Sequence, residues 1–286
     1  MTSKILLQID NARVNYLGKA TFENLNFTWY SGQHWAITGD SGRELTAFLE
    51  TLRGSTHLPE GRFFKPFADE YIAQKTEEGS VHSYRDLVAY VSQQYRFRNK
   101  SNLQNFYFQQ RFNSSEADEA ATVREYLLEN STPISGPWDL EKVSDLLRIT
   151  PLLDSSILKL SNGETRRLAL ALGLLRQPKI YLMDQPMTGL DQESRAAFGD
   201  FLLAIISEGI AVLITTSSTE IPEGITHVAK LESSGKIHIW QREKHILNKG
   251  QALNLPWNLE LLEELLGGFP EGENEVIRLE NVSIRY

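Results

Sequence analysis

The 286-residue chain contains no cysteine, which excludes disulfide bonds and thiolate metal sites. No apolar run reaches the about 18 residues that a membrane-spanning helix needs. The opening residues, MTSKILLQID, lack the long apolar core of a signal peptide. The formal net charge of −8 gives no support for a nucleic-acid partner. These absences predict a cytoplasmic protein, whose contact with a membrane, if any, is made at the inner face through a partner.

Hydrophobic residues make up 41% of the chain, enough for a sizeable core, and the length suits one large domain or a domain and a half. Alternating apolar and polar residues predict half-buried strands at 5–16 and 22–29. Short apolar segments typical of buried strands cover residues 34–38, 87–91, 179–184, 211–215 and 228–231. Helical apolar spacing covers residues 46–53, 122–128, 140–147 and 195–206, whereas residues 54–85 are weakly patterned. The alternation of strands with helices predicts the α/β fold class.

One stretch, residues 160–191, combines three features in a fixed order. It opens a helix with Leu160, Ser161, Asn162, Gly163 and Glu164, and it closes with a turn of Thr188, Gly189, Leu190 and Asp191. Ser161 is placed to cap that helix, whose unpaired N–H groups favour a phosphate, and Gly163 lets the backbone approach the phosphate closely. Between helix and turn, an apolar strand ends in Asp184, where a carboxylate can hold Mg²⁺.

A second stretch lies between the strand at 34–38 and the helix at 46–53, the context of a phosphate-binding P-loop, G-x-x-x-x-G-K-[ST]. Its residues are Gly39, Asp40, Ser41, Gly42, Arg43, Glu44, Leu45 and Thr46. Gly39 and Thr46 match the motif, but Glu44 replaces the second glycine and Leu45 replaces the lysine. The missing lysine removes a positive charge from the phosphates, and the Glu44 carboxylate repels them. This stretch is therefore a P-loop by position and not by chemistry.

Together these stretches resemble the signature motif, Walker B strand, D-loop and P-loop position of the ATP-binding cassette (ABC) ATPases, over about residues 1–245. The resemblance implies a P-loop NTPase fold of the ABC type, with a parallel sheet core, an antiparallel β-subdomain and a helical subdomain at about residues 97–160. It implies ATP and Mg²⁺ as cofactors, with Thr46, Gln93 and Asp184 near the metal. Gln94 is the alternative to Gln93 in this role. A glutamine at either position that does not play this role is an ordinary surface loop residue. Tyr16 occupies the place of an aromatic that stacks on adenine, and packing on the sheet is its alternative role.

Two further positions of the implied catalytic site are altered. Gln185 stands where the family has the general-base glutamate, and an amide can hold a water but cannot take its proton at neutral pH. Thr216 stands where the family has a histidine that contacts the γ-phosphate. With Leu45, these changes predict that ATP binding at the chain's own site is weak or absent, and that this half alone is impaired or inactive. An engineered change at Gln185 would leave Leu45 and Thr216 unexplained, so natural degeneration is preferred.

The C-terminal residues indicate a tandem arrangement. Residues 246–275 read as a linker with an amphipathic helix at 258–266. Residues 277–286 repeat the apolar alternation of residues 7–16, for which chance is the alternative explanation. We therefore expect residues 276–286 to be the first strand of a truncated second cassette. The segments 107–113 (YFQQRFN) and 220–228 (EIPEGITHV) further resemble tandem double-cassette proteins of the molybdate-transport type.

ABC cassettes work as head-to-tail pairs, in which each ATP lies between the P-loop of one cassette and the signature motif of the other. The resemblance implies that this chain is half of a tandem ATPase, the ATP-binding component of a transporter, and that Ser161 and its neighbours complete the ATP site of the second cassette. A transmembrane permease subunit is a further expected partner. The alternatives are a non-catalytic regulatory or scaffold cassette and an ABC ATPase with no role in transport.

Overall fold

The computed structural model describes residues 4–93, 121–131, 136–190, 192–216, 221–232 and 234–241. These residues all belong to the first of the two units into which the chain divides, Met1–His245 and Ile246–Tyr286. Some predictions fall outside the described residues: Gln94, Asp191, the segment 107–113, the linker 246–275 and the strand 276–286.

A three-stranded antiparallel sheet contains β1 (Ile5–Tyr16), β2 (Lys19–Tyr30) and β4 (His57–Phe64), in the order β2-β1-β4. The alternation predicted for β1 is confirmed, because Leu7, Ile9, Ala12 and Val14 are buried while their neighbours are exposed or partly exposed. Strand β4 was not predicted. It is largely exposed, so its sequence shows no apolar stripe for pattern reasoning to detect.

A six-stranded sheet has the order β5-β6-β7-β3-β8-β9. Its strands are β3 (Trp35–Gly39), β5 (Val88–Val91), β6 (Ile180–Asp184), β7 (Ala211–Thr215), β8 (His227–Leu231) and β9 (Ile237–Gln241). The first five strands of this order run parallel, and β9 pairs with β8 antiparallel at one edge. All but β9 were predicted, and the parallel α/β core is confirmed. The carboxyl ends of β3, β6 and β7 lie at one edge of the sheet, where α/β folds place ligands.

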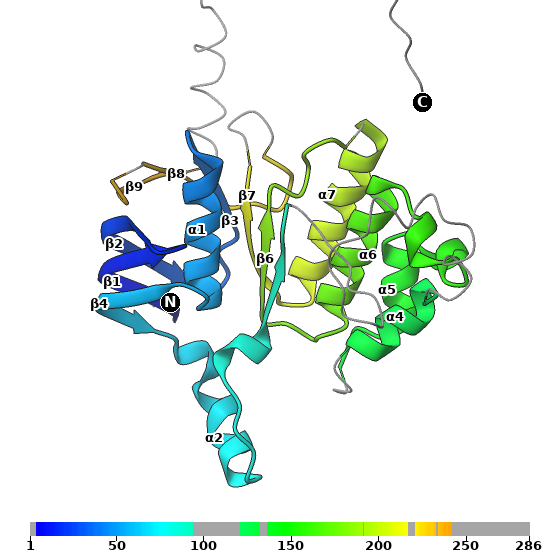
Figure 1. Cartoon of the computed structure of the whole chain (residues 1–286), viewed down its shortest axis with the longest axis horizontal. Helices are drawn as coiled ribbons and strands as arrows, with labels where there is room; N and C mark the ends of the chain where they lie inside the picture. Colours follow the sequence, from blue (N-terminus) through cyan, green and yellow to red (C-terminus); the bar gives the residue numbers. More distant parts are fainter. Residues whose placement is uncertain are drawn as a thin grey trace, which may run out of the picture. The chain divides into compact units, whose positions relative to one another are not determined.

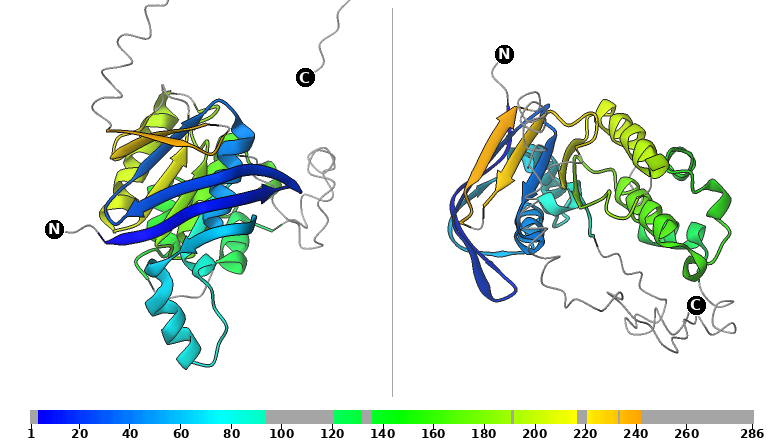
Figure 2. Two further views of the ribbon diagram at one scale, coloured as in Figure 1. Left: turned by 90° about the vertical axis from the view of Figure 1, so that its left-hand side faces the viewer. Right: turned by 90° about the horizontal axis from the view of Figure 1, so that it is seen from above.

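The two faces of the six-stranded sheet are covered differently, as Figures 1 and 2 show. On one face, α1 (Gly42–Arg53) and the antiparallel sheet pack against alternate strand residues such as Ile37 and Leu213. On the other face, alternate residues such as Tyr181 and Ile214 share a buried cluster with residues of four helices. These are α4 (Val123–Asn130), α5 (Leu140–Leu146), α6 (Asn162–Leu174) and α7 (Gln192–Ser207). Of these helices, α6 and α7 contact the strands, whereas α4 and α5 pack against α6.

One helix, α2 (Asp69–Glu77), projects away from the sheets (Figures 1 and 2) and contains no buried residue among those described. It was not predicted, because a solvated helix carries no apolar face. Short 3₁₀ helices connect the elements at Pro66–Ala68, Tyr84–Leu87, Thr150–Leu152 and Ile157–Lys159. Within the described residues, no helix combines the length and the apolar character needed to cross a membrane.

Candidate functional site

A connector of only two residues, 40 and 41, joins the end of β3 at Gly39 to the start of α1 at Gly42. The sequence predicted that this helix begins near residue 46, and that prediction is wrong by about one turn. Ser41 caps the helix: its hydroxyl accepts the N–H of Glu44 at 3.4 Å, and its carbonyl accepts the N–H of Leu45 at 3.2 Å. Two amides that a longer P-loop could turn toward a phosphate are therefore used inside the helix.

Leu45, at the position of the P-loop lysine, turns into the protein. It is 3% exposed and belongs to the same buried cluster as Phe48 and Ile37. A Cβ atom on Gly39 would lie 3.2 Å from Leu45 Cδ2 and 3.1 Å from the carbonyl oxygen of Leu231, so this glycine is needed for close packing. The side chain that would hold a phosphate in a P-loop instead completes the core beneath the loop.

The charges around this connector are mixed. Lys230, at the end of β8, places its Nζ 2.9 Å from the carboxylate of Asp40. Burial raises the pKa of the Tyr16 hydroxyl, and the carboxylates of Glu50 and Asp184 raise it further. The Arg43 guanidinium opposes this shift, so charges of both signs act on Tyr16. Its contact with an adenine stays a prediction.

Asp184 lies at the carboxyl end of β6 and is only 2% exposed. Its two oxygens accept separate hydrogen bonds, Oδ2 from the Thr46 hydroxyl at 2.7 Å and Oδ1 from the Thr215 hydroxyl at 2.7 Å. A buried carboxylate needs such donors, because an ionised group without partners is costly to bury. The structure thus brings two of the three predicted Mg²⁺ neighbours, Thr46 and Asp184, into direct contact.

Gln93 and Gln185 lie opposite each other beside that carboxylate. The Gln93 amide nitrogen donates to Gln185 Oε1 at 3.1 Å, and the backbone N–H of Gln185 donates to the Thr215 hydroxyl at 2.9 Å. Gln185 has a left-handed φ of 46°, and an added Cβ on Gly42 would lie 3.5 Å from its Nε2. Gln185 therefore faces the start of α1. Thr216 is 6% exposed, and its N–H donates to the carbonyl of Ile37 at 3.0 Å.

These side chains fit a Mg²⁺ ion in their donor chemistry. Hydroxyl, carboxylate and amide oxygens from Thr46, Asp184 and Gln93 are the hard ligands that Mg²⁺ prefers, and the ion usually takes further ligands from phosphates and water. Among the described residues, no group of three or more His, Cys, Asp or Glu side chains forms a protein-only metal site.

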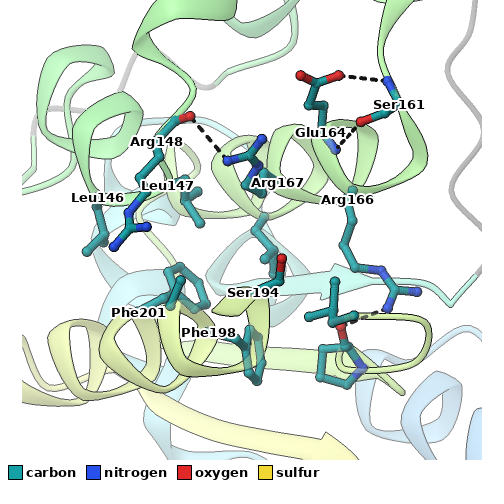
Figure 3. A pocket seen from close by; sticks show the side chains of 15 residues that line it. Leu146, Leu147, Arg148, Ser161, Glu164, Arg166, Arg167, Ser194, Phe198 and Phe201 are labelled. Carbon is teal, nitrogen blue, oxygen red and sulfur yellow. Dashed lines mark hydrogen bonds between the residues drawn. The ribbon is translucent and has the colours of Figure 1, made fainter. Parts of the chain in front are cut away.

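The helix predicted at the signature segment is confirmed, with Ser161 as its N-cap (Figure 3). The Ser161 hydroxyl accepts the N–H of Glu164 at 3.3 Å, and the Glu164 carboxylate accepts the N–H of Ser161 at 2.7 Å. The hydrogen bond from the Ser161 N–H lowers the pKa of Glu164, and the Ser161 side chain lowers it further. Asn162 and Gly163 are exposed, and a Cβ on Gly163 would meet no atom within 4 Å. The fold itself therefore gives no packing reason for glycine at this position.

Arg166 is a residue that the sequence analysis missed. Its guanidinium donates to four backbone carbonyls: those of Gln93 at 3.3 Å, Gln185 at 3.3 Å, Pro186 at 2.7 Å and Thr188 at 2.8 Å. One side chain of the signature helix thus holds both the end of β5 and the turn after β6. Burial lowers the pKa of this guanidinium, and the Asp184 carboxylate opposes that effect. An arginine one turn into a helix was visible in the sequence, but its inward direction was not.

A protein-family model described as "ABC transporter" matches residues 22–188, more than half of the chain. The fold and the order of the site segments agree with this match, and the chain belongs to the ABC transporter family as an ATP-binding cassette. The resemblance found in the sequence is thereby confirmed at the level of the family and its fold. Members of this family bind ATP with Mg²⁺, and membership in the family indicates ATP hydrolysis as the reaction type.

Curated relatives show how much of a longer protein the chain corresponds to. An uncharacterized ABC transporter ATP-binding protein of Schizosaccharomyces pombe is 27% identical over 242 residues, which cover 82% of the chain and 47% of the relative. The ABC transporter ATP-binding protein ModF of Escherichia coli is 26% identical over 218 residues, covering 76% of the chain and 40% of ModF. The chain thus spans about half the length of these relatives or less.

Solved structures support the fold. The structure of cbiO1 from Clostridium perfringens, described as part of the ABC transporter complex cbiONQ, superposes with a TM-score of 0.63. The match covers 92% of this chain and 99% of that one, at 19% sequence identity. At this identity the likeness concerns the fold alone.

Proposed function

We propose that this chain is one half of an asymmetric pair of ABC cassettes. In this proposal its own P-loop position binds ATP weakly or not at all, and its signature segment, Ser161 to Glu164, completes the ATP site of a second cassette. The pair is the cytoplasmic ATP-binding component of a transporter and works with a transmembrane permease at the inner face of the membrane. ABC cassettes dimerise and pair with permease subunits, which supports such an assembly.

The contrast between two helix starts carries the proposal. At α1, the loop is reduced to two residues and Leu45 fills the place of the lysine with a buried apolar side chain. At α6, the Glu164 carboxylate is tied back to the N–H of Ser161, and Gly163 stands exposed with open space around it. A serine caps both helices through the same two amides, so the capping does not distinguish them. The difference that supports the proposal is that Gly163 leaves the start of α6 open to a phosphate from another molecule, which the helix dipole favours.

Carboxylates near the chain's own site support the first half of the proposal, although Arg43 and Arg53 add positive charge to the same surroundings. Burial raises the pKa of Tyr90, and the carboxylates of Asp184 and Glu50 raise it further, so two negative charges act on Tyr90. Glu44 adds a third carboxylate in the first turn of α1. A nucleotide phosphate placed here meets repulsion that no P-loop lysine offsets.

The length of the relatives supports a second cassette in the same parent chain. This chain covers 47% of the S. pombe protein and 40% of ModF, so both relatives have room for a further domain of similar size. We propose such a tandem partner, with residues 276–286 as its first strand, and name no cargo for the transporter.

A non-catalytic regulatory or scaffold cassette is the second candidate. The observation that favours it is the pairing of Gln93 with Gln185, because two amides facing each other at 3.1 Å supply no base for a water. In that case the signature segment would be a helix cap with no ligand.

The test is made on Ser161 in the full-length parent protein. Aspartate caps a helix about as well as serine, so Ser161→Asp keeps α6 stable while its carboxylate repels a phosphate. We expect its ATPase rate to fall about 100-fold, as when a donor to a developing charge is lost. Ser161→Arg, which adds bulk and positive charge, should also abolish activity, while Ser161→Thr serves as the matched control.

Two outcomes contradict the proposal. One is equal ATPase activity of Ser161→Asp and the wild-type protein when both are folded, because Ser161 is then only a cap. The other is a parent protein that hydrolyses no ATP at all, which favours the regulatory or scaffold cassette.

A further inference from the structure

Three segments of the candidate site surround a cavity of about 320 Å³. They are residues 91–93 at and after the end of β5, residues of α6 between Asn162 and Ala169, and residues 188–190 of the turn after β6. Close packing holds segments together in a protein core, but side chains leave the space between these three unfilled. Hydrogen bonds that cross this space therefore matter for how the segments are placed.

The side chain of Arg166 makes such a bridge. It lines the cavity, and its guanidinium donates to the carbonyl of Gln93 on one side and to three carbonyls of the turn after β6 on the other. In Figure 3 this side chain points away from Ser161 and Glu164. One residue of the signature helix thus joins all three segments around the cavity.

The hydrogen bonds of the signature segment itself have a different effect. Ser161 and Glu164 bond to each other, so these bonds shape the first turn of α6 without fixing its place in the protein. The next arginine along the helix, Arg167, donates from Nη1 to the carbonyl of Arg148 just after α5, at 3.4 Å. Arg167 therefore ties α6 to the neighbouring helices, whereas Arg166 ties it to the carboxyl edge of the sheet.

We propose that Arg166 is a positioning residue for ATP hydrolysis at the site of the second cassette, because it fixes the direction in which Ser161 and Gly163 face that cassette. This inference rests on the proposed function of the signature segment. In it Arg166 touches no nucleotide and acts only through the placement of α6. A shift of about 1 Å in a group that faces the reacting atoms can cost about 100-fold in rate, so a signature helix without this tie serves the reaction poorly.

The first measurement compares kcat and KM in the full-length parent protein with Mg-ATP. Arg166→Lys keeps the charge, but a single ammonium cannot span carbonyls on both sides of the cavity as a guanidinium does. We expect kcat per folded molecule to fall about tenfold and KM to change less than about twofold. KM is spared because, in this proposal, the P-loop of the second cassette holds the ATP.

Arg167→Lys is the matched control. It lies one position further along the same helix, and both arginines are partly exposed. Its hydrogen bond to the Arg148 carbonyl needs only one donor, which a lysine also provides. We expect kcat of Arg167→Lys to stay within about twofold of the wild-type value. Circular dichroism of both variants gives the folded fraction to which each rate is referred.

The cavity allows a second readout that a loss of stability alone would not produce. Arg166→Ala enlarges the cavity, so a small cation can enter the place of the missing side chain. We expect a few millimolar ethylguanidinium to raise kcat of Arg166→Ala at least about fivefold, because its planar fork can donate to several carbonyls. Ethylammonium, which has the same charge and no fork, should restore little.

The proposal is overturned if Arg166→Lys and Arg167→Lys have equal kcat, or if the change in Arg166→Lys is confined to KM. Equal effects of ethylguanidinium and ethylammonium on Arg166→Ala also overturn it. The proposed function is judged separately by Ser161→Asp: if that variant loses activity in any of these cases, the signature segment serves the second site without help from Arg166. A parent protein without ATPase activity overturns both.

Discussion

The hydroxyl of Thr46 in α1 donates a 2.7 Å hydrogen bond to the carboxylate of Asp184 at the end of β6. Thr215 satisfies the other oxygen of that carboxylate at the same distance. The two residues expected to share a Mg²⁺ ion are therefore bound to each other. The Thr46 hydroxyl can keep this hydrogen bond and still offer an oxygen lone pair to a Mg²⁺ ion that arrives with ATP, but Leu45 supplies no charge to hold the phosphates.

We expect Mg-ATP to bind this chain weakly when it is alone. The reasons are the buried Leu45, the short connector and the carboxylates around Tyr90. Isothermal titration calorimetry should give no dissociation constant in the low micromolar range. A control titration without Mg²⁺ shows whether any residual binding depends on the metal. Low micromolar binding of Mg-ATP would contradict the prediction.

Restoring the P-loop lysine should not restore turnover. In Leu45→Lys, position 185 still carries a glutamine, which is not a base, and position 216 still carries a threonine, which has no imidazole. The substitution also forces an ammonium into a site that is 3% exposed. We expect no phosphate release above background and a free energy of unfolding lower by about 2 to 4 kcal/mol. Leu45→Met is the control, because it conserves volume and should cost less than about 1.5 kcal/mol. Release of phosphate by Leu45→Lys at a normal cassette rate, without a partner, would show that the other two positions do not limit catalysis.

Arg166→Lys should loosen the turn after β6 although it keeps the charge. A lysine has a single ammonium, which cannot reach four carbonyls spread over residues 93 to 188 as a guanidinium does. We expect faster amide hydrogen exchange at residues 185–190 and about 1 to 3 kcal/mol less stability. Arg176→Lys, at an exposed position of the same region, should change neither quantity. Unchanged exchange in Arg166→Lys would mean that the turn holds its shape without these bonds.

His34 should make the folded state less stable in mild acid. Burial lowers the pKa of His34, and the nearby His227 imidazole lowers it further. As the pH falls below about 6.5, the unfolded chain takes up protons before the folded chain does, so the free energy of unfolding decreases. His34→Gln removes this titration while offering an acceptor to the N–H of Val212, which lies 3.3 Å from His34 Nδ1.

Urea denaturation between about pH 7 and pH 5 measures this effect. The loss of stability across that window should be smaller in His34→Gln than in the wild-type chain. His57→Gln, at an exposed histidine, is the control. Parallel pH profiles of His34→Gln and the wild-type chain would rule out His34 as the source.

Pattern reasoning succeeded where one face of an element is buried. The strands of the parallel sheet are largely apolar, and Ser161 caps α6 as predicted. It failed for β4 and α2, which are largely solvated, and for the start of α1. At α1 the P-loop motif suggested an extended loop up to residue 46, but Ser41 begins the helix as soon as β3 ends.

By itself, the sequence determined which chemical groups stand at the positions compared with the family: leucine at 45, glutamine at 185, threonine at 216 and serine at 161. Residue identity and local spacing are sufficient for that. Only the tertiary structure decided that Leu45 enters the core, that Arg166 rather than Arg167 turns toward residues 185–188, and that Thr46 meets Asp184. These contacts join segments as much as 138 residues apart, and their outcome depends on how whole elements pack, which no local pattern encodes.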